Sequence, residues 1–138
     1  MKLPYINTIC FLICISYVNS QYHVLQNSID SVTKCLLKFT TTREESKTYF
    51  DNPDKTSHNF KCFLKCMVEE EGFFQNGSPV AELVFETHKT NKYLAATSEE
   101  LLEVIERCHA LVGDDDCDTV FKISRCFDDI VYGKVHHT

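Results

Sequence analysis

Apolar residues recur at helical spacing along most of the chain beyond its first twenty residues. Between positions 29 and 40, for example, Ile29, Val32, Cys35, Leu36 and Phe39 fall on one face of a helix. The same period predicts helices near 43–50 and 57–71, a fourth from residue 78, a fifth from about 98 and a sixth from about 116 or 118. No stretch alternates apolar and polar residues between hairpin turns, so the pattern predicts an all-α domain.

Start and stop signals support several of these helices. Residues 97–100, TSEE, form a capping box pattern at the start of the fifth helix. Ser78 and Pro79 supply an N-cap and a first-turn proline for the fourth. Gly72 and Gly113 are placed to end the third and the fifth helices.

The first twenty residues differ from the rest, because Lys2 is their only charge and an apolar run fills positions 9–18. This pattern is typical of a secretory signal peptide, which we place at residues 1–20, with cleavage after Ser20. A transmembrane helix is the alternative, but the run is only ten residues long and a bilayer span needs about 20. The mature chain, residues 21–138, is the length of one domain.

Charge limits the classes of partner. The mature chain has 13 basic and 20 acidic residues and so a net charge of −7 with histidines neutral. A chain of this charge repels phosphate backbones, so we expect no nucleic acid partner.

Cysteines then carry most of the information about structure. Cys10 and Cys14 lie in the expected signal peptide, and an even number in a small exported chain predicts a disulfide framework. Fifteen pairings of six cysteines are open, and spacing alone does not choose among them. The six are Cys35, Cys62, Cys66, Cys108, Cys117 and Cys126.

The pair in KCFLKCM sits four residues apart, so Cys62 and Cys66 share one helical face and each needs a partner elsewhere. A redox pair would more often be CxxC at a helix start, and a zinc site would need further ligands at close spacing. We interpret the pair as part of a scaffold, with no metal and no redox role.

The ordered cysteine spacing, with 26, three, 41, eight and eight residues between successive members, resembles the signature of insect odorant-binding proteins. The stretches KCFLKCMVEEEGFF and DCDTVFKISRCF are similar to the third and last helices of that family, so the resemblance covers essentially the whole mature chain. It implies a compact six-helix domain stapled by three disulfides around an internal hydrophobic cavity. The implied pairs are Cys35 with Cys66, Cys62 with Cys117, and Cys108 with Cys126.

The resemblance implies a secreted soluble carrier that takes a small hydrophobic ligand, such as an odorant or pheromone, through an aqueous fluid. Implied partners are that ligand and, at delivery, a membrane receptor; we expect a monomer or weak homodimer and no cofactor. The candidates to line or rim the cavity, each of which also fits an ordinary filled core, are Phe63, Met67, Phe73, Phe74, Leu83, Val84, Tyr93, Leu101, Ile105, His109, Phe121 and Tyr132.

A competing interpretation is a secreted, disulfide-stapled helical protein, such as a venom or salivary factor, whose surface binds another protein. An enzyme is not expected, because GxSxG, HExxH and a nucleophile with a placed histidine are missing from the sequence, so we predict no catalytic residue.

Three local patterns have simpler interpretations. An EF-hand loop counted from Asp114 would put Thr119 where glycine belongs and Arg125 where glutamate belongs, so a solvated turn is expected there. Asn76 begins a glycosylation sequon, but the proline that follows it makes modification less favourable than a plain turn. The tail, residues 131–138, is expected to form a lid or wall over the cavity, with its charged residues either solvated or sensitive to acid.

Overall fold

The structure is a computed structural model that describes residues 29–136, with side chains up to residue 133. The expected signal peptide and His137 lie outside the described residues. The chain divides into two units, Met1–Lys34 and Cys35–Thr138. Only residues 29–34 of the first unit are described, and the site discussed below lies entirely in the second.

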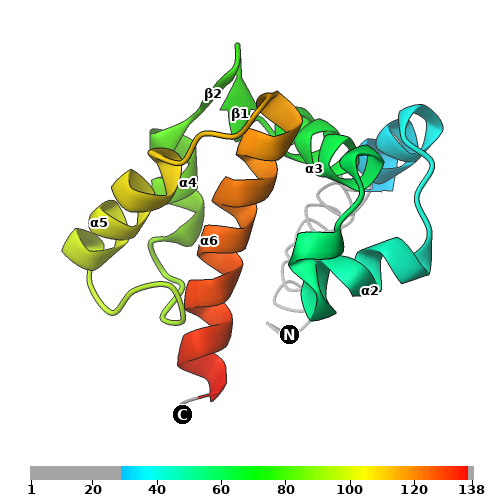
Figure 1. Ribbon diagram of the computed structural model, residues 1–138. Helices are drawn as coiled ribbons and strands as arrows, with labels where there is room; N and C mark the ends of the chain where they lie inside the picture. Colours follow the sequence, from blue (N-terminus) through cyan, green and yellow to red (C-terminus); the bar gives the residue numbers. More distant parts are fainter. Residues whose placement is uncertain (1–28, 137–138) are drawn as a thin grey trace, which may run out of the picture. The chain divides into compact units, whose positions relative to one another are not determined.

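Six α-helices account for most of the described residues, which confirms the all-α prediction (Figure 1). The short η1 (Pro53–Lys55) is a single 3-10 turn. None of the helices in the described range is long and apolar enough to cross a bilayer. The six are residues 29–38, α2 (Arg43–Asp51), α3 (His58–Glu70), α4 (Ala81–His88), α5 (Ser98–His109) and α6 (Asp116–His136).

The starts of α3 and α5 have side-chain caps at the expected positions, but one hydrogen bond of the α5 capping box is displaced by one residue. Ser57 accepts from the Phe60 N–H at 3.1 Å and begins α3 where predicted. Thr97 accepts from the Glu100 N–H at 3.2 Å, as a capping box requires. The Glu100 carboxylate, however, accepts from the Ala96 N–H at 2.7 Å, so the reciprocal half of the box lies one residue earlier than predicted.

Gly72 ends α3 as expected. Its φ is +83°, a value that favours glycine, and its N–H donates to the Glu69 carbonyl at 3.0 Å. The Phe73 N–H donates to the Val68 carbonyl at 2.8 Å, which completes a Schellman motif. The turn directs the chain into the segment that follows α3.

That segment contradicts the predicted start of the fourth helix. Strands β1 (Phe74–Gln75) and β2 (Ser78–Pro79) pair antiparallel, and α4 begins only at Ala81. Asn76 and Gly77 form the hairpin turn with φ values of +52° and +77°. Asn-Gly is the preferred pair for such a turn, so the hairpin uses Ser78 and Pro79 before a helix can begin.

α6 is longer than predicted and absorbs the expected tail up to His136. Ile130 and Val131 continue the helical spacing of Ile123 and Phe127, so one continuous face runs along the helix. The described part of the tail therefore extends a helix and does not fold back as a separate lid.

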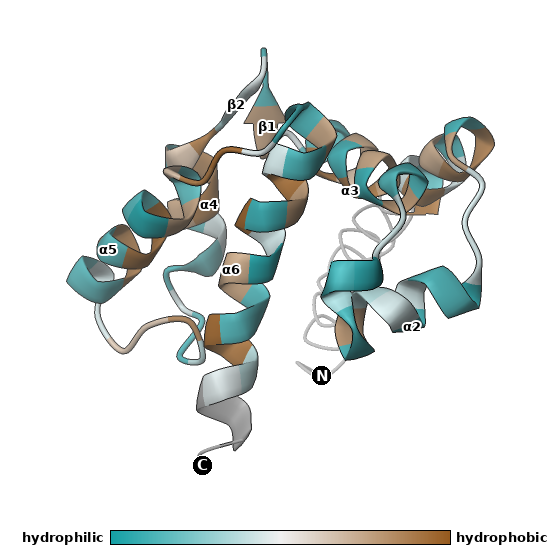
Figure 2. Ribbon diagram, viewed as in Figure 1, coloured by the Kyte–Doolittle hydropathy of each residue, from teal (hydrophilic) through white to brown (hydrophobic). Residues whose placement is uncertain are grey.

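α6 is the central element of the second unit, with α5 on one side and α3 on the other (Figure 1). On α5 the hydrophobic residues gather on the side turned toward α4 and α6 (Figure 2). Leu101 and Ile105 on that side are 2% and 3% exposed and form a core cluster with Val84 and Leu94. This core holds the α4–α5 pair against the second half of α6.

Three disulfides connect these helices, in the pairing that the family resemblance implies. Within the second unit, one joins Cys35 to α3, one joins α3 to the first turn of α6, and one joins α5 to the middle of α6. The bonds are Cys35–Cys66, Cys62–Cys117 and Cys108–Cys126.

Candidate ligand-binding cavity

A cavity of about 480 Å³ lies among the end of α3, the hairpin, α4, the end of α5 and one face of α6. Ten of its seventeen lining residues are apolar. The apolar members are Val68, Phe73, Phe74, Pro79, Val84, Leu94, Val120, Ile123, Phe127 and Val131, and the polar members are Glu71, Thr87, His88, Asn91, His109, Ser124 and Asp128.

α6 supplies the longest wall. Val120, Ile123, Phe127 and Val131 follow one another at intervals of three or four residues and so lie on one face. Ser124 on the same face is the smallest side chain of this wall and leaves room in front of it. The face is a single continuous apolar stripe with a hydroxyl in its middle.

The facing wall comes from the hairpin and α4. Phe74 is only 3% exposed and Val84 only 7%, so both are fixed by their surroundings. Phe73 stacks on the His88 ring with 6.3 Å between centroids and 24° between planes. Aromatic packing thus holds an imidazole in the wall.

Two histidines line the cavity, and both are biased toward the neutral form. His109, at the end of α5, contacts the Phe127 ring edge to face with 5.8 Å between centroids. Burial lowers the pKa of His88 and the pKa of His109 below the ordinary value of 6.5. Each ring therefore offers one donor and one acceptor at neutral pH.

Two carboxyl groups also reach the cavity. Glu71 lies at an exposed edge, and partial burial raises its pKa. Burial is also the largest cause that raises the pKa of Asp128, although the Tyr49 hydroxyl donates to its Oδ2 at 2.5 Å and Arg125 lies nearby. The Arg125 guanidinium lies over the Tyr49 ring, 5.2 Å from its centroid, and this contact helps to hold the phenol in place.

Four of the predicted candidates lie in the wall: Phe73, Phe74, Val84 and His109. The other eight do not line this cavity. Leu101 and Ile105 lie in the core cluster with Val84 and Leu94, and Tyr93 and Tyr132 are 43% and 46% exposed. The remaining four are Phe63, Met67, Leu83 and Phe121.

Phe121 shows why part of the set was misplaced. It follows Val120 directly, so its side chain projects from α6 about 100° away from that of Val120. There the Lys61 Nζ lies 4.4 Å from its ring centroid, and Phe121 lines a second, shallower hollow. The stripe of Val120, Ile123, Phe127 and Val131 was visible in the sequence and could have identified the correct face.

Polar wall residues had weaker sequence signals. His88 and Asn91 lie at the end of α4 and just after it, at positions that resemble any solvated helix end. The hairpin places the start of α4 at Ala81, three residues after the predicted start at Ser78.

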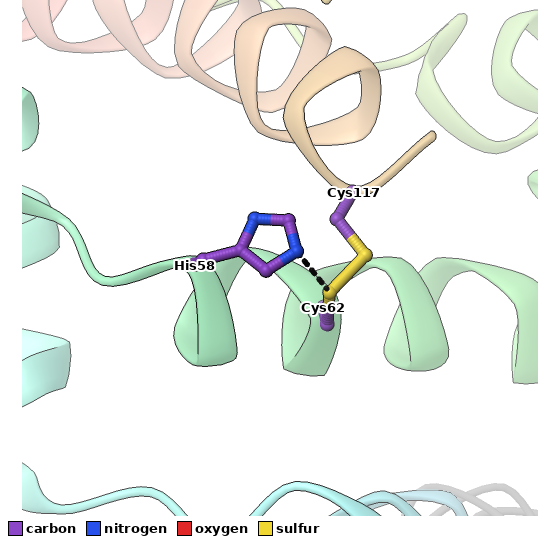
Figure 3. Close-up of side chains that lie close together, drawn as sticks. All are labelled: His58, Cys62 and Cys117. Carbon is purple, nitrogen blue, oxygen red and sulfur yellow. Dashed lines mark hydrogen bonds between the residues drawn. A yellow bond between two sulfur atoms is a disulfide. The ribbon is translucent and has the colours of Figure 1, made fainter. Parts of the chain in front are cut away.

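A second cluster, formed by His58, Cys62 and Cys117, has the residue types of a metal site (Figure 3). The His58 Nε2 lies 3.5 Å from the Cys62 Sγ and 3.4 Å from the Asp115 carboxylate. Both sulfurs belong to the Cys62–Cys117 disulfide, so neither is a thiolate that could bind a metal. The cluster therefore surrounds the disulfide that joins α3 to α6.

Comparison with known proteins gives consistent matches. The sequence model of the PBP/GOBP family matches residues 19–129. General odorant-binding protein 56a of Drosophila melanogaster is 29% identical over 89 residues, which make up 64% of this chain and 60% of that relative's length.

Two solved structures share the fold. One is described as a fatty acid binding protein, OBP56a, from the oral disk of the blowfly Phormia regina. It has 24% identity and a TM-score of 0.61, over 78% of this chain and 91% of that one. The other is the odorant-binding protein OBP28a of Drosophila melanogaster, with 21% identity and a TM-score of 0.58 over 80% of this chain and 94% of that one.

Proposed function

Because the chain belongs to the PBP/GOBP family, we propose that it is a secreted soluble carrier that binds a small hydrophobic ligand in the cavity and moves it through an aqueous fluid. The observation that carries the proposal is the apolar cavity of about 480 Å³. Ligand pockets in proteins commonly measure roughly 300 to 1,000 Å³ and have mostly apolar walls with a few polar groups.

Disulfides explain how such a cavity is compatible with a stable domain. An unfilled interior weakens a fold, because its lining atoms lose packing contacts. Cys62–Cys117 and Cys108–Cys126 join the first turn and the middle of α6 covalently to α3 and α5. We expect these links to keep the walls in place when the cavity holds no ligand.

Energetics favour binding of intermediate strength. A ligand that buries about 250 Å² of apolar surface gains roughly 6 kcal/mol at about 25 cal/mol per Å², before entropy costs. Polar contacts with a wall side chain add roughly 1 kcal/mol each, which suits a micromolar dissociation constant. Such a carrier loads and releases its ligand reversibly.

Secretion and delivery belong to the same proposal. The apolar run at positions 9–18 and three disulfides suit an exported protein, and the hydrophobic ligand would pass to a membrane receptor. The blowfly relative, described as a fatty acid binding protein, suggests an apolar chain with a polar head as the first ligand class to try.

The test is displacement of N-phenylnaphthylamine from the disulfide-bonded protein. We expect saturable probe fluorescence with about one site per chain. Ser124→Phe places a ring in the cavity and should weaken probe binding by about tenfold or more, since the wall loses the space in front of Ser124. Gly133→Phe is the matched control on α6, because Gly133 does not line the cavity and a Cβ there would meet nothing within 4 Å.

Equal probe binding by the two variants would contradict the cavity as the binding site. If the folded protein takes up no probe at saturation, the carrier proposal fails and the surface-binding interpretation gains support.

A further inference from the structure

The charges around the cavity are of one sign. Glu71 and Asp128 are the only formally charged side chains that line it among the described residues, and neither lysine nor arginine does so. A carboxylate inside this wall would meet two like charges and no cation.

Three cations on the elements that flank the cavity are paired elsewhere. Arg125 pairs with Asp129 at 2.5 Å and stacks on Tyr49. Lys65 pairs with Glu69 at 2.9 Å. On α4, the other flank of the cavity, Lys89 pairs with Glu86 at 2.6 Å. A bound anion would have to break one of these pairs to gain that cation as its partner.

The wall also disfavours charge of either sign. Burial is the first cause of each pKa shift among the four titratable lining groups. It raises the pKa of Glu71 and of Asp128 and lowers the pKa of His88 and of His109, so all four move toward their neutral forms. A charged ligand head would meet the same desolvation penalty.

Neutral polar groups are nevertheless available for a hydrogen bond. Ser124 carries a hydroxyl in the middle of the α6 stripe, and His88 and His109 each offer a donor and an acceptor. A hydroxyl or carbonyl head could pair with any of these while its chain lies along the apolar stripe.

We propose that the cavity selects neutral apolar molecules with a hydroxyl or carbonyl head and rejects carboxylates of the same chain length, because the described residues of its wall include two acidic side chains, no lysine or arginine and several neutral hydrogen-bonding groups. The inference rests on the proposed carrier function and specifies its ligand class.

Competition against N-phenylnaphthylamine with three matched compounds tests it: decanol, decanoic acid and decylamine. At pH 7 we expect decanol to bind at least about tenfold more tightly than decanoate, and more tightly than decylammonium. If only the neutral acid enters, the apparent affinity for decanoic acid should rise about tenfold when the pH falls from 7 to 6, whereas decanol binding changes less than about twofold.

A charge variant with a matched control locates the effect. Glu71→Gln should improve decanoate binding by about threefold and leave decanol binding unchanged, because it removes one like charge at the cavity edge. Glu82→Gln removes the same charge from an exposed residue of α4 that does not line the cavity, and it should change neither affinity.

Decanoate binding equal to or tighter than decanol binding at pH 7 would overturn the inference, as would preferred binding of decylammonium. An equal gain from Glu82→Gln would also overturn it, because net charge and not the cavity wall would then govern exclusion. These outcomes all require probe binding, so they are distinct from failure of the carrier function, in which no probe binds at all.

Discussion

Asp118 and Asp128 stand ten residues apart on α6, and their surroundings shift the pKa values of the two carboxyl groups in opposite directions. Asp118 is 8% exposed and lies 2.6 Å from the Lys61 Nζ and 3.0 Å from the Lys122 Nζ. The hydrogen bond from Lys61 is the largest cause that holds its pKa well below the usual range. Asp128 pairs with the neutral Tyr49 phenol, and burial raises its pKa.

The difference separates two tasks along one helix. At the first turn, charge is compensated and the Cys62–Cys117 disulfide joins α6 to α3 one residue before Asp118. Farther along, the helix face is apolar and its polar groups tend toward neutrality. The start of α6 and the turn before it form an anchor, which we define as Gly113, Cys117 and Asp118 with their contacts, and the face from Val120 to Val131 is the wall.

The largest expected effect comes from opening the anchor covalently. Cys62→Ser with Cys117→Ser removes a link across 55 residues, which on the chain-entropy model should lower the free energy of unfolding by about 4 kcal/mol. Urea unfolding at pH 7 measures it. A loss below about 1 kcal/mol would mean that α6 is held mainly by its noncovalent contacts.

The second largest effect is expected from removal of the Asp118 charge in the anchor. Asp118→Asn leaves Lys61 and Lys122 without their counter-charge and should cost about 3 kcal/mol at neutral pH. Asp129→Asn, which breaks the exposed pair with Arg125, should cost less than about 1 kcal/mol.

The pH dependence of that loss has a defined sign. Because the folded pKa of Asp118 is depressed, its stabilisation is present above its unfolded value near 3.8 and is lost as pH falls through the folded pKa. The gap between the wild type and Asp118→Asn should therefore be full at pH 7 and shrink below pH 4. A gap that stays constant down to acid would rule out the lysine pairs as its source.

A glycine pair tests the packing of the anchor. A Cβ at Gly113 would lie 2.5 Å from the Thr119 backbone nitrogen, so Gly113→Ala should destabilise by about 2 kcal/mol. Near the other end of α6, a Cβ at Gly133 would meet nothing within 4 Å, and Gly133→Ala should stabilise the helix by about 0.5 to 1 kcal/mol. Thermal unfolding of both variants checks the opposite signs.

The smallest expected effect is at Asp128, where the pH dependence of stability has the opposite sign to that at Asp118. A raised folded pKa means that the wild type loses stability as pH rises from the unfolded value near 3.8 through the folded pKa. The asparagine of Asp128→Asn cannot ionise, so the free energy of unfolding of this variant relative to the wild type should rise with pH. At pH 7 the gain should be less than about 1 kcal/mol. Denaturant midpoints of both proteins at pH 4 and pH 7 measure this. A variant that is less stable relative to the wild type at pH 7 than at pH 4 would contradict the prediction.

Sequence reasoning reached the helices because their signals are local. Ser57 and Thr97 cap the helices that they were expected to start, and Gly72 ends the helix expected to stop there. Local signals competed at Ser78, where a good N-cap residue follows the stronger Asn-Gly turn and the hairpin forms instead.

The cavity was harder to predict because apolar residues look alike from the sequence. Leu101 and Phe73 are both large and apolar, yet one closes the core and the other faces the hollow. That choice depends on how the hairpin, α4 and α6 meet, and helical period specifies only which residues share a face. On α6 the period was sufficient, and the stripe from Val120 to Val131 is the part of the wall that the sequence could have given in full.

The central claim is that a small apolar molecule binds in the cavity that the α6 wall borders. Calorimetric titration of the disulfide-bonded protein with decanol at several temperatures tests this most directly. We predict one site per chain with a negative heat-capacity change, the signature of apolar surface leaving water, and loss of the signal in Ser124→Phe. No saturable heat, or the same heat in Ser124→Phe as in the wild type, would contradict the account.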